Sequence, residues 1–172
     1  MTKIAVIIGS LSSQSINRNV ATEILKNAPQ DVVYEVVQID DLPLYTQDLD
    51  AVTIPAYDRV RAQLAAADAV LIVSPEHNRS VPAAVKNILD IGTRPFGKSV
   101  WIGKKVAVVT ASPGSYGGIN AGLHLRQILQ AIGAQVLNAP EVYLSHASLD
   151  MNERTSDFLT KFASRFFSWI KE

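Results

Sequence analysis

The 172-residue sequence predicts an α/β protein in which five parallel strands are covered by helices on both faces. Two observations predict this class. Short aliphatic runs alternate along the chain with segments in which apolar residues recur at helical spacing. The runs are almost continuously apolar, as expected of strands that are buried on both sides. The strands are predicted at Ile4–Ile8, Val32–Ile39, Ala69–Val73, Val106–Thr110 and Gln135–Leu144.

Caps and apolar stripes predict five helices between and after these strands. Ser15 is placed to cap the first helix, Pro82 is expected inside the first turn of the third, and Gly133 ends the fourth. The last helix carries a broad apolar stripe that is expected to pack across the sheet. That stripe consists of Phe158, Leu159, Phe162, Ala163, Phe166 and Ile170. The helices are predicted to start at or near Ile16, Pro55, Ser80, Ile119 and Asn152.

The amino-acid composition argues against several classes of function, among them nucleic-acid binding, thiol chemistry and metal binding. Sixteen basic and sixteen acidic residues balance, so no overall field favours nucleic acid or an anionic membrane. Cysteine is absent, which excludes disulfides and thiolate chemistry and fits a reducing compartment. The three histidines are scattered, so no metal site is expected. With no linker, signal peptide or membrane span in the sequence, we expect one domain over residues 1–172, located in the cytoplasm.

The order of the strands follows from the number of strands. Right-handed crossovers leave two common orders, and 2-1-3-4-5, the flavodoxin-like order, suits five strands in one domain. In either order, ligands bind where parallel strands end. The three most unusual loops follow the first, third and fourth strands, so we expect them to meet at one edge of the sheet.

The first of these loops is rich in hydroxyl groups and precedes a helix N-terminus, where unpaired N–H groups favour an anion. It offers the side chains of Ser10, Ser12, Ser13, Ser15 and Asn17. A phosphate site is one interpretation, and a capped helix start with solvated serines is the other. The stretch lacks the glycine patterns of dinucleotide-binding and P-loop proteins.

The other two loops also admit two interpretations each. After the third strand, Pro75 fixes the backbone, and His77 and Asn78 are expected over the strand ends, where a planar ligand could stack. The alternative is a turn that leads to a helix capped by Ser80. After the fourth strand, a glycine-rich stretch allows backbone N–H groups to approach a ligand, with Tyr116 at the rim. The alternative there is a mobile surface loop.

Several stretches, taken together, resemble one family. GSLSSQSIN, DLPLY, PEHNRSVPAAVKNILD, ASPGSYGGINAGLHLRQIL and NAPEVYL are similar to motifs of the NADPH-dependent FMN reductases, especially their quinone and chromate reductase branch. The resemblance implies a flavodoxin-like three-layer fold that holds FMN non-covalently. The cofactor-binding residues predicted from the motifs and loops are Ser10, Ser12, Ser15, Ile16, Asn17, Pro75, Glu76, His77, Asn78, Ser112, Gly114 and Gly117.

Two positions depart from the family pattern. Ser12 stands where the family commonly has an arginine, and His77 stands where it commonly has a tyrosine. The first departure removes a bidentate partner for a phosphate, for which Arg18 and Arg79 are alternative sources of charge.

The resemblance also implies a reaction. NADPH or NADH would reduce the flavin and leave, and a quinone or a similar acceptor (free flavin, an azo compound or chromate) would then take two electrons at the same site. No catalytic side chain is predicted, because the cofactor carries the chemistry. Family members are usually dimers or tetramers, and we expect the helix after PEHN and the region 123–141 to serve assembly. A flavodoxin-like electron carrier and an interaction module without flavin are the alternatives.

Overall fold

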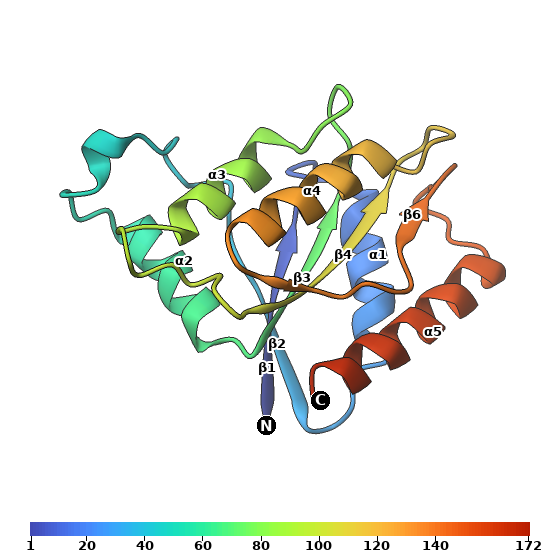
Figure 1. The fold of residues 1–172 in the computed structure, drawn as a ribbon. Helices are drawn as coiled ribbons and strands as arrows, with labels where there is room; N and C mark the ends of the chain where they lie inside the picture. Colours follow the sequence, from blue (N-terminus) through green and yellow to red (C-terminus); the bar gives the residue numbers. More distant parts are fainter.

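The computed structural model describes residues 1–172 and places a parallel sheet between two layers of helices (Figure 1). The sheet has the order β2-β1-β3-β4-β5, and a sixth strand, β6, also pairs with β4. Every pairing is parallel, so the predicted order 2-1-3-4-5 is confirmed. The strands are β1 (Thr2–Ile8), β2 (Val32–Val36), β3 (Ala69–Ser74), β4 (Lys105–Ala111), β5 (Gln135–Val136) and β6 (Val142–Leu144).

The last predicted strand, residues 135–144, is wrong as one element. The structure divides it into β5, which pairs with the start of β4, and β6, which pairs with its end. Pro140 lies between the two pieces and has no N–H to donate to the ladder, so pairing cannot run through it. The sheet therefore has six strands where five were predicted.

Helices cover both faces of the sheet. Helices α1 and α5 pack on one face against the alternate residues Ile4, Val6 and Ile8 of β1. Helices α2, α3 and α4 pack on the other face against Ala5 and Ile7. No helix combines the length and apolar character that crossing a membrane requires. The helices are α1 (Ile16–Leu25), α2 (Pro55–Ala66), α3 (Ala83–Gly92), α4 (Ile119–Ala131) and α5 (Glu153–Trp169), with a short 3-10 turn at Gln47–Leu49.

A polar contact joins α1 to α5 at their solvent side. Glu23 of α1 forms an ion pair with Lys26 (2.6 Å) and accepts a hydrogen bond from Ser156 of α5. The hydrogen bond with Lys26, followed by that from Ser156, holds the pKa of Glu23 below its ordinary value. The ionised carboxylate is thus the form that the folded chain favours.

Three boundaries or exposures differ from the predictions. β2 ends at Val36 because the chain then leaves the ladder, and Ile39 packs on the α2 side instead. α3 begins after Pro82, which is its N-cap, because Ser80 is held in a tight turn and cannot cap the helix. Phe158 is 39% exposed, although the other members of the α5 stripe are buried, since it lies in the N-terminal part of α5 beside a surface hollow.

Candidate functional site

Three loops leave the sheet at the ends of β1, β3 and β4, which are adjacent strands. We name them loop 1 (residues 9–15), loop 2 (residues 75–82) and loop 3 (residues 112–118). Because Ile8 at the end of β1 lies opposite Val73 of β3, loops 1 and 2 leave at the same level. All three lie along one edge of the sheet, which we call the carboxyl edge (Figure 1).

The serines of loop 1 hold the loop together through their oxygen atoms. The Oγ of Ser10 accepts from the N–H of Ser12 (3.4 Å), and the Oγ of Ser12 accepts from the N–H of Gln14 (3.2 Å). Ser15 caps α1 as predicted, since its Oγ accepts from the N–H of Arg18 (3.1 Å). The oxygens therefore shape the loop, while each hydroxyl keeps a hydrogen that it can donate.

Gly9 fixes loop 1 against its neighbour. Its N–H donates to the carbonyl of Val73 (2.8 Å). A Cβ at this position would lie 2.7 Å from the Oγ of Ser74 and 2.8 Å from Cγ2 of Val85, closer than such atoms approach. Only glycine fits there, and the start of loop 1 therefore packs closely against the end of β3 and against α3.

Asn17 joins loop 1 to the end of β4. Its side chain is only 4% exposed, and its Nδ2 donates to the carbonyl of Ala111 (3.5 Å). Its Oδ1 is buried without a hydrogen-bond partner, and leaving such an acceptor unpaired costs about 1–3 kcal/mol. The N–H groups of Ile16 and Asn17 lie in the first turn of α1, where no helical carbonyl precedes them. Unpaired donors and an unpaired acceptor thus meet at the start of α1.

Loop 2 contains a tight turn with an uncommon backbone. His77 and Ser80 exchange two backbone hydrogen bonds of 2.9 and 3.0 Å. Between them, Asn78 and Arg79 both have positive φ, 48° and 68°, as in a type I′ turn. Asparagine tolerates this region, whereas arginine is strained in it, by roughly 1–3 kcal/mol. The turn presents Pro75 on its entry side and the side chains of His77 and Asn78 toward solvent at the carboxyl edge.

The carboxylate of Glu76 caps α4 rather than pointing freely from loop 2. One oxygen accepts from the backbone N–H groups of Asn120 (2.9 Å) and Ala121 (3.1 Å), and the other from Nδ2 of Asn120 (3.3 Å). The N-cap of α4 is Gly118, which has no side chain to do this. The charge of Glu76 therefore offsets the positive end of the α4 dipole, and only its backbone is free to contact a ligand.

Loop 3 depends on glycine in a specific way. Gly117 has φ +61°, and a Cβ there would lie 2.7 Å from the backbone of Tyr143. Its carbonyl accepts from Oγ1 of Thr110 (2.8 Å). Gly114, by contrast, has open space around it and donates to the Oγ of Ser112 (3.1 Å). Gly117 thus positions the loop, while the Ser112–Gly114 part is the accessible part.

Arg79 and Tyr116 connect the rims of loops 2 and 3. The guanidinium of Arg79 lies over the ring of Tyr116, 4.7 Å from its centroid, a cation–π contact. Gly9 of loop 1 lies against Ser74, the last residue of β3, and Asn17 at the start of α1 bonds to Ala111, the last residue of β4. Loops 2 and 3 are therefore in direct contact, loop 1 is packed against the end of β3, and the predicted site residues lie together at the carboxyl edge.

Sequence reasoning missed a fourth segment, residues 144–149, which closes the edge between loop 3 and α1. The N–H of Ser112 donates to the carbonyl of Leu144 (3.0 Å), and the N–H of Ala147 donates back to the carbonyl of Ser112 (3.0 Å). Nδ2 of Asn19 in α1 donates to the carbonyl of Leu149 (3.1 Å). The signal available in the sequence was the serine-containing stretch Ser145–Ser148 directly after a predicted strand.

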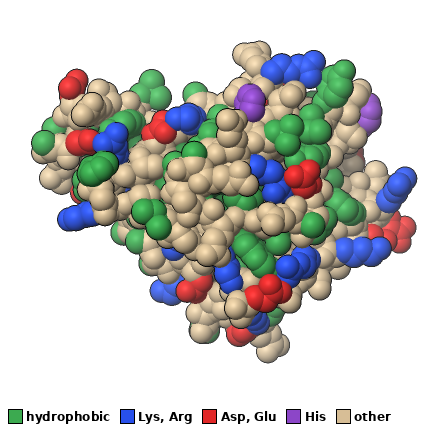
Figure 2. Space-filling model, in the orientation of Figure 1, with side chains coloured by type: hydrophobic (Ala, Val, Ile, Leu, Met, Phe, Trp, Pro, Cys, Tyr) green, Lys and Arg blue, Asp and Glu red, His purple; other side chains and the backbone are tan.

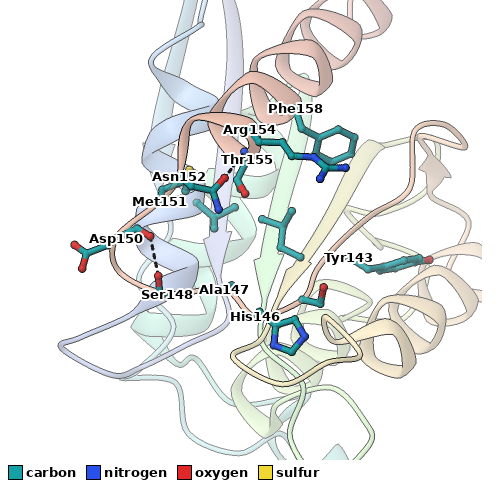
Figure 3. A pocket seen from close by; sticks show the side chains of 13 residues that line it. Tyr143, His146, Ala147, Ser148, Asp150, Met151, Asn152, Arg154, Thr155 and Phe158 are labelled. Atoms are coloured by element: carbon teal, nitrogen blue, oxygen red, sulfur yellow. Dashed lines mark hydrogen bonds between the residues drawn. The ribbon is translucent and has the colours of Figure 1, made fainter.

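Two surface hollows flank the site. The hollow at the start of α5, of about 360 Å³, is lined by His146, Arg154 and Phe158 among others (Figure 3). The hollow beside loop 1, of about 240 Å³, is lined by Ser10, Leu11 and Arg18 on one side and by residues 36–40 on the other. Neither lies directly over loops 2 and 3, so the carboxyl edge is an open surface between two deeper spaces.

A 2-1-3-4-5 parallel sheet, with helices on both faces and ligand-type loops at the ends of β1, β3 and β4, defines a flavodoxin-like protein. The family can also be stated. The family model described as NADPH-dependent FMN reductase matches residues 2–148, and the chain belongs to that family.

Relatives cover nearly the whole chain. A quinone reductase of Pseudomonas putida is 43% identical over 175 residues, which is 98% of this chain and 94% of the relative. A 2-hydroxy-1,4-benzoquinone reductase of a Burkholderia species is 38% identical, covering 99% and 97%. Among solved structures, a flavoenzyme NAD(P)H:(acceptor) oxidoreductase of Paracoccus denitrificans is similar, with a TM-score of 0.91 and 33% identity over 99% of this chain and 98% of that one.

Proposed function

We propose that this chain is an FMN-dependent NAD(P)H oxidoreductase that reduces quinones. Membership of the NADPH-dependent FMN reductases and full-length similarity to quinone reductases support this function. The single observation that carries it is the buried, unpartnered Oδ1 of Asn17 beside the open first turn of α1. Such an arrangement is stabilised when a ligand brings both an anion and a hydroxyl donor to that place.

FMN has these groups in the required order, because a phosphate and a hydroxylated ribityl chain lead to its planar ring. Loop 1 and the start of α1 would hold the phosphate and ribityl end, through Ser10, Ser12, Ser15, Ile16 and Asn17. Pro75, the backbone of Glu76, His77 and Asn78 would lie alongside the ring. Ser112 and Gly114 would contact its polar side, and Gly117 would hold loop 3 in place for that contact. The accessible position of Gly114 and the contact between loops 2 and 3 support this assignment.

Bound FMN supplies the exchange of two electrons between a nicotinamide and a quinone. The chain supplies position and electrostatics. The edge between the two hollows leaves one face accessible. N–H groups of loops 2 and 3 that form no bond within the protein would stabilise negative charge on the ring. We therefore propose that NAD(P)H and the acceptor occupy this face in turn, with no side chain as acid or base.

Two alternatives are disfavoured by specific observations. Flavodoxin-like electron carriers are usually strongly acidic, whereas this chain has a formal charge of zero. On the face shown in Figure 2, basic and acidic side chains are interspersed rather than gathered by sign. An interaction module without flavin would have no reason to keep an unpaired acceptor buried at Asn17.

We also propose that the chain works as a single domain, in the cytoplasm, as a homodimer or homotetramer. The groove between α3 and α4, about 650 Å³, supports self-association, since both helices contribute to it and its lining includes Val81 and Ile128. Leu123, also on α4, is 48% exposed. Because a two-fold interface uses one patch twice, Leu123→Lys is expected to reduce the mass measured by sedimentation. An unchanged mass would move the interface elsewhere.

Flavin binding is the direct test of the proposed function. The purified chain should bind added FMN and show the visible absorption of a flavoprotein, and a chain that binds none would refute the proposal. Rapid oxidation of NAD(P)H with a quinone, and parallel double-reciprocal lines, are expected of the enzyme. Reduction that requires a separate reductase would instead indicate an electron carrier.

The role of loop 2 can be tested without disturbing its turn. Asn78→Gly keeps the positive φ but removes the side chain, so stability should stay near wild type while FMN binds more weakly. The comparison is the dissociation constant of the variant and of wild type, with thermal unfolding as the control. Equal constants would remove the Asn78 side chain from the site.

A further inference from the structure

The cofactor phosphate needs more positive charge than loop 1 contains. A phosphate monoester carries roughly 1.5 to 2 negative charges at pH 7. Residues 9–15 include no lysine or arginine. The dipole at the start of α1 is equivalent to about half a positive charge, and no acidic residue in its first turn reduces it. A cation from outside the loop would add to this charge, and the two candidates next to loops 1 and 2 are Arg18 and Arg79.

The structure commits Arg79 to another partner. Its guanidinium lies 4.7 Å from the centroid of the Tyr116 ring, so it joins loop 2 to loop 3. Its backbone sits at φ 68° inside the tight turn of loop 2, which fixes where the side chain begins. Moving this guanidinium to loop 1 would break the contact between the two rims.

Arg18 has the opposite properties. It lines the hollow beside loop 1 together with Ser10 and Leu11. Its backbone N–H is bonded to the capping Oγ of Ser15, so its place in the first turn of α1 is fixed. The side chain is exposed and forms no ion pair, although Asp40 lines the same hollow. An arginine without a carboxylate partner therefore lines the same hollow as Ser10 of loop 1.

We propose that Arg18 supplies the positive charge that recognises the phosphate of FMN in this chain. The proposal rests on the proposed function. In this chain the cation would come from the first turn of α1, because the loop position where the family commonly has an arginine holds Ser12. Riboflavin lacks the phosphate, so Arg18 would determine the preference for FMN over riboflavin. Contacts to the ring would be the same for both flavins.

The test compares FMN and riboflavin binding to the full chain stripped of flavin, followed by flavin fluorescence. Arg18→Ala is expected to weaken FMN roughly tenfold to a hundredfold, the range of a charge-assisted hydrogen bond, and to leave riboflavin within about twofold. Arg79→Ala should weaken both flavins, since it loosens the loops beside the ring. Lys161→Ala, which removes an exposed cation of α5 that lines neither hollow, is the control and should change neither.

Rescue makes the test independent of folding defects. Ser12→Arg added to Arg18→Ala should restore most of the lost FMN affinity without strengthening riboflavin. An unchanged ratio of FMN to riboflavin affinity in Arg18→Ala would overturn the role of Arg18 and leave the proposed function intact. An equal loss in Lys161→Ala would also overturn it, because the effect would then be long-range. A wild-type chain that binds neither flavin would refute the proposed function itself.

Discussion

Replacing Glu76 tests whether loop 2 is organised by α4 before any ligand binds. In Glu76→Ala, the N–H groups of Asn120 and Ala121 lose their acceptor, and Gly118 offers no side chain in its place. A hydrogen bond to a charged group contributes about 1.5–3 kcal/mol, and a charge at a helix N-terminus about 0.3–1 kcal/mol. Because the carboxylate is on the surface side of the site, we expect a loss of about 2–3 kcal/mol in all. For a chain of this size, that lowers Tm by about 4–12 °C.

The assay is urea denaturation of the flavin-free chain, followed by circular dichroism. Glu76→Gln should lose roughly half as much free energy as Glu76→Ala, because an amide oxygen still accepts but carries no charge. Glu153→Ala is the matched control, since Glu153 lies in the first turn of α5, whose N-cap Asn152 already has a side-chain hydrogen bond. It should cost less than about 0.5 kcal/mol.

One outcome would refute this reasoning about Glu76. If Glu76→Ala unfolds in the flavin-free form within about 0.5 kcal/mol of wild type but binds FMN much more weakly, the carboxylate acts on the ligand and not on the helix. The reverse result, a large loss of stability with a modest loss of affinity, would establish Glu76 as a positioning residue.

Two further substitutions test other parts of the structure. Gly117→Ala should cost about 2–3 kcal/mol and weaken flavin binding, because φ at this position is +61° and a Cβ would clash with the backbone of Tyr143. Gly114→Ala is the control, because its Cβ would meet only a side-chain oxygen at 3.5 Å. Thermal unfolding should show wild-type stability for Gly114→Ala and a lower Tm for Gly117→Ala. Glu23→Gln should cost about 0.5–1 kcal/mol at neutral pH, and the difference should disappear as pH falls below the lowered pKa of Glu23. The sign follows from the lowered pKa of Glu23: its contribution is present above the unfolded value of 4.5 and is lost as pH falls through the lower folded pKa. A constant difference between pH 3 and 7 would contradict this.

The sequence predicts the sheet well because its central strands are buried on both faces and must be continuously apolar. β1, β3 and β4 all lie where the aliphatic runs place them. The prediction fails at the sheet's edge, where residues 135–144 form two short strands. An edge strand is specified by its pairing with one neighbour and by turn chemistry at Pro140, and an apolar pattern does not report either.

The position of the candidate site was predictable from the sequence, but the contacts that individual side chains make there were not. That loops 1, 2 and 3 meet follows from topology alone. The bond between Glu76 and the start of α4 spans 44 residues of sequence, and the contact between Asn19 and Leu149 spans 130. Local spacing holds no information on such contacts. The same limit explains why Arg79 and Arg18 were equivalent in the sequence and differ in the structure.

The geometry of α1 suggests why its first turn, rather than the loop before it, would decide what binds. Consecutive residues of a helix point about 100° apart, so Asn17 and Arg18 face different sides of the same turn. Asn17 is directed to the end of β4, and Arg18 to the hollow beside β2. The loop serines use their oxygens to fix the backbone and so cost a ligand little reorganisation. A ligand over this turn then meets an acceptor on one side and a cation on the other. A molecule with a hydroxylated chain and a terminal phosphate satisfies both, and a neutral one satisfies only the first.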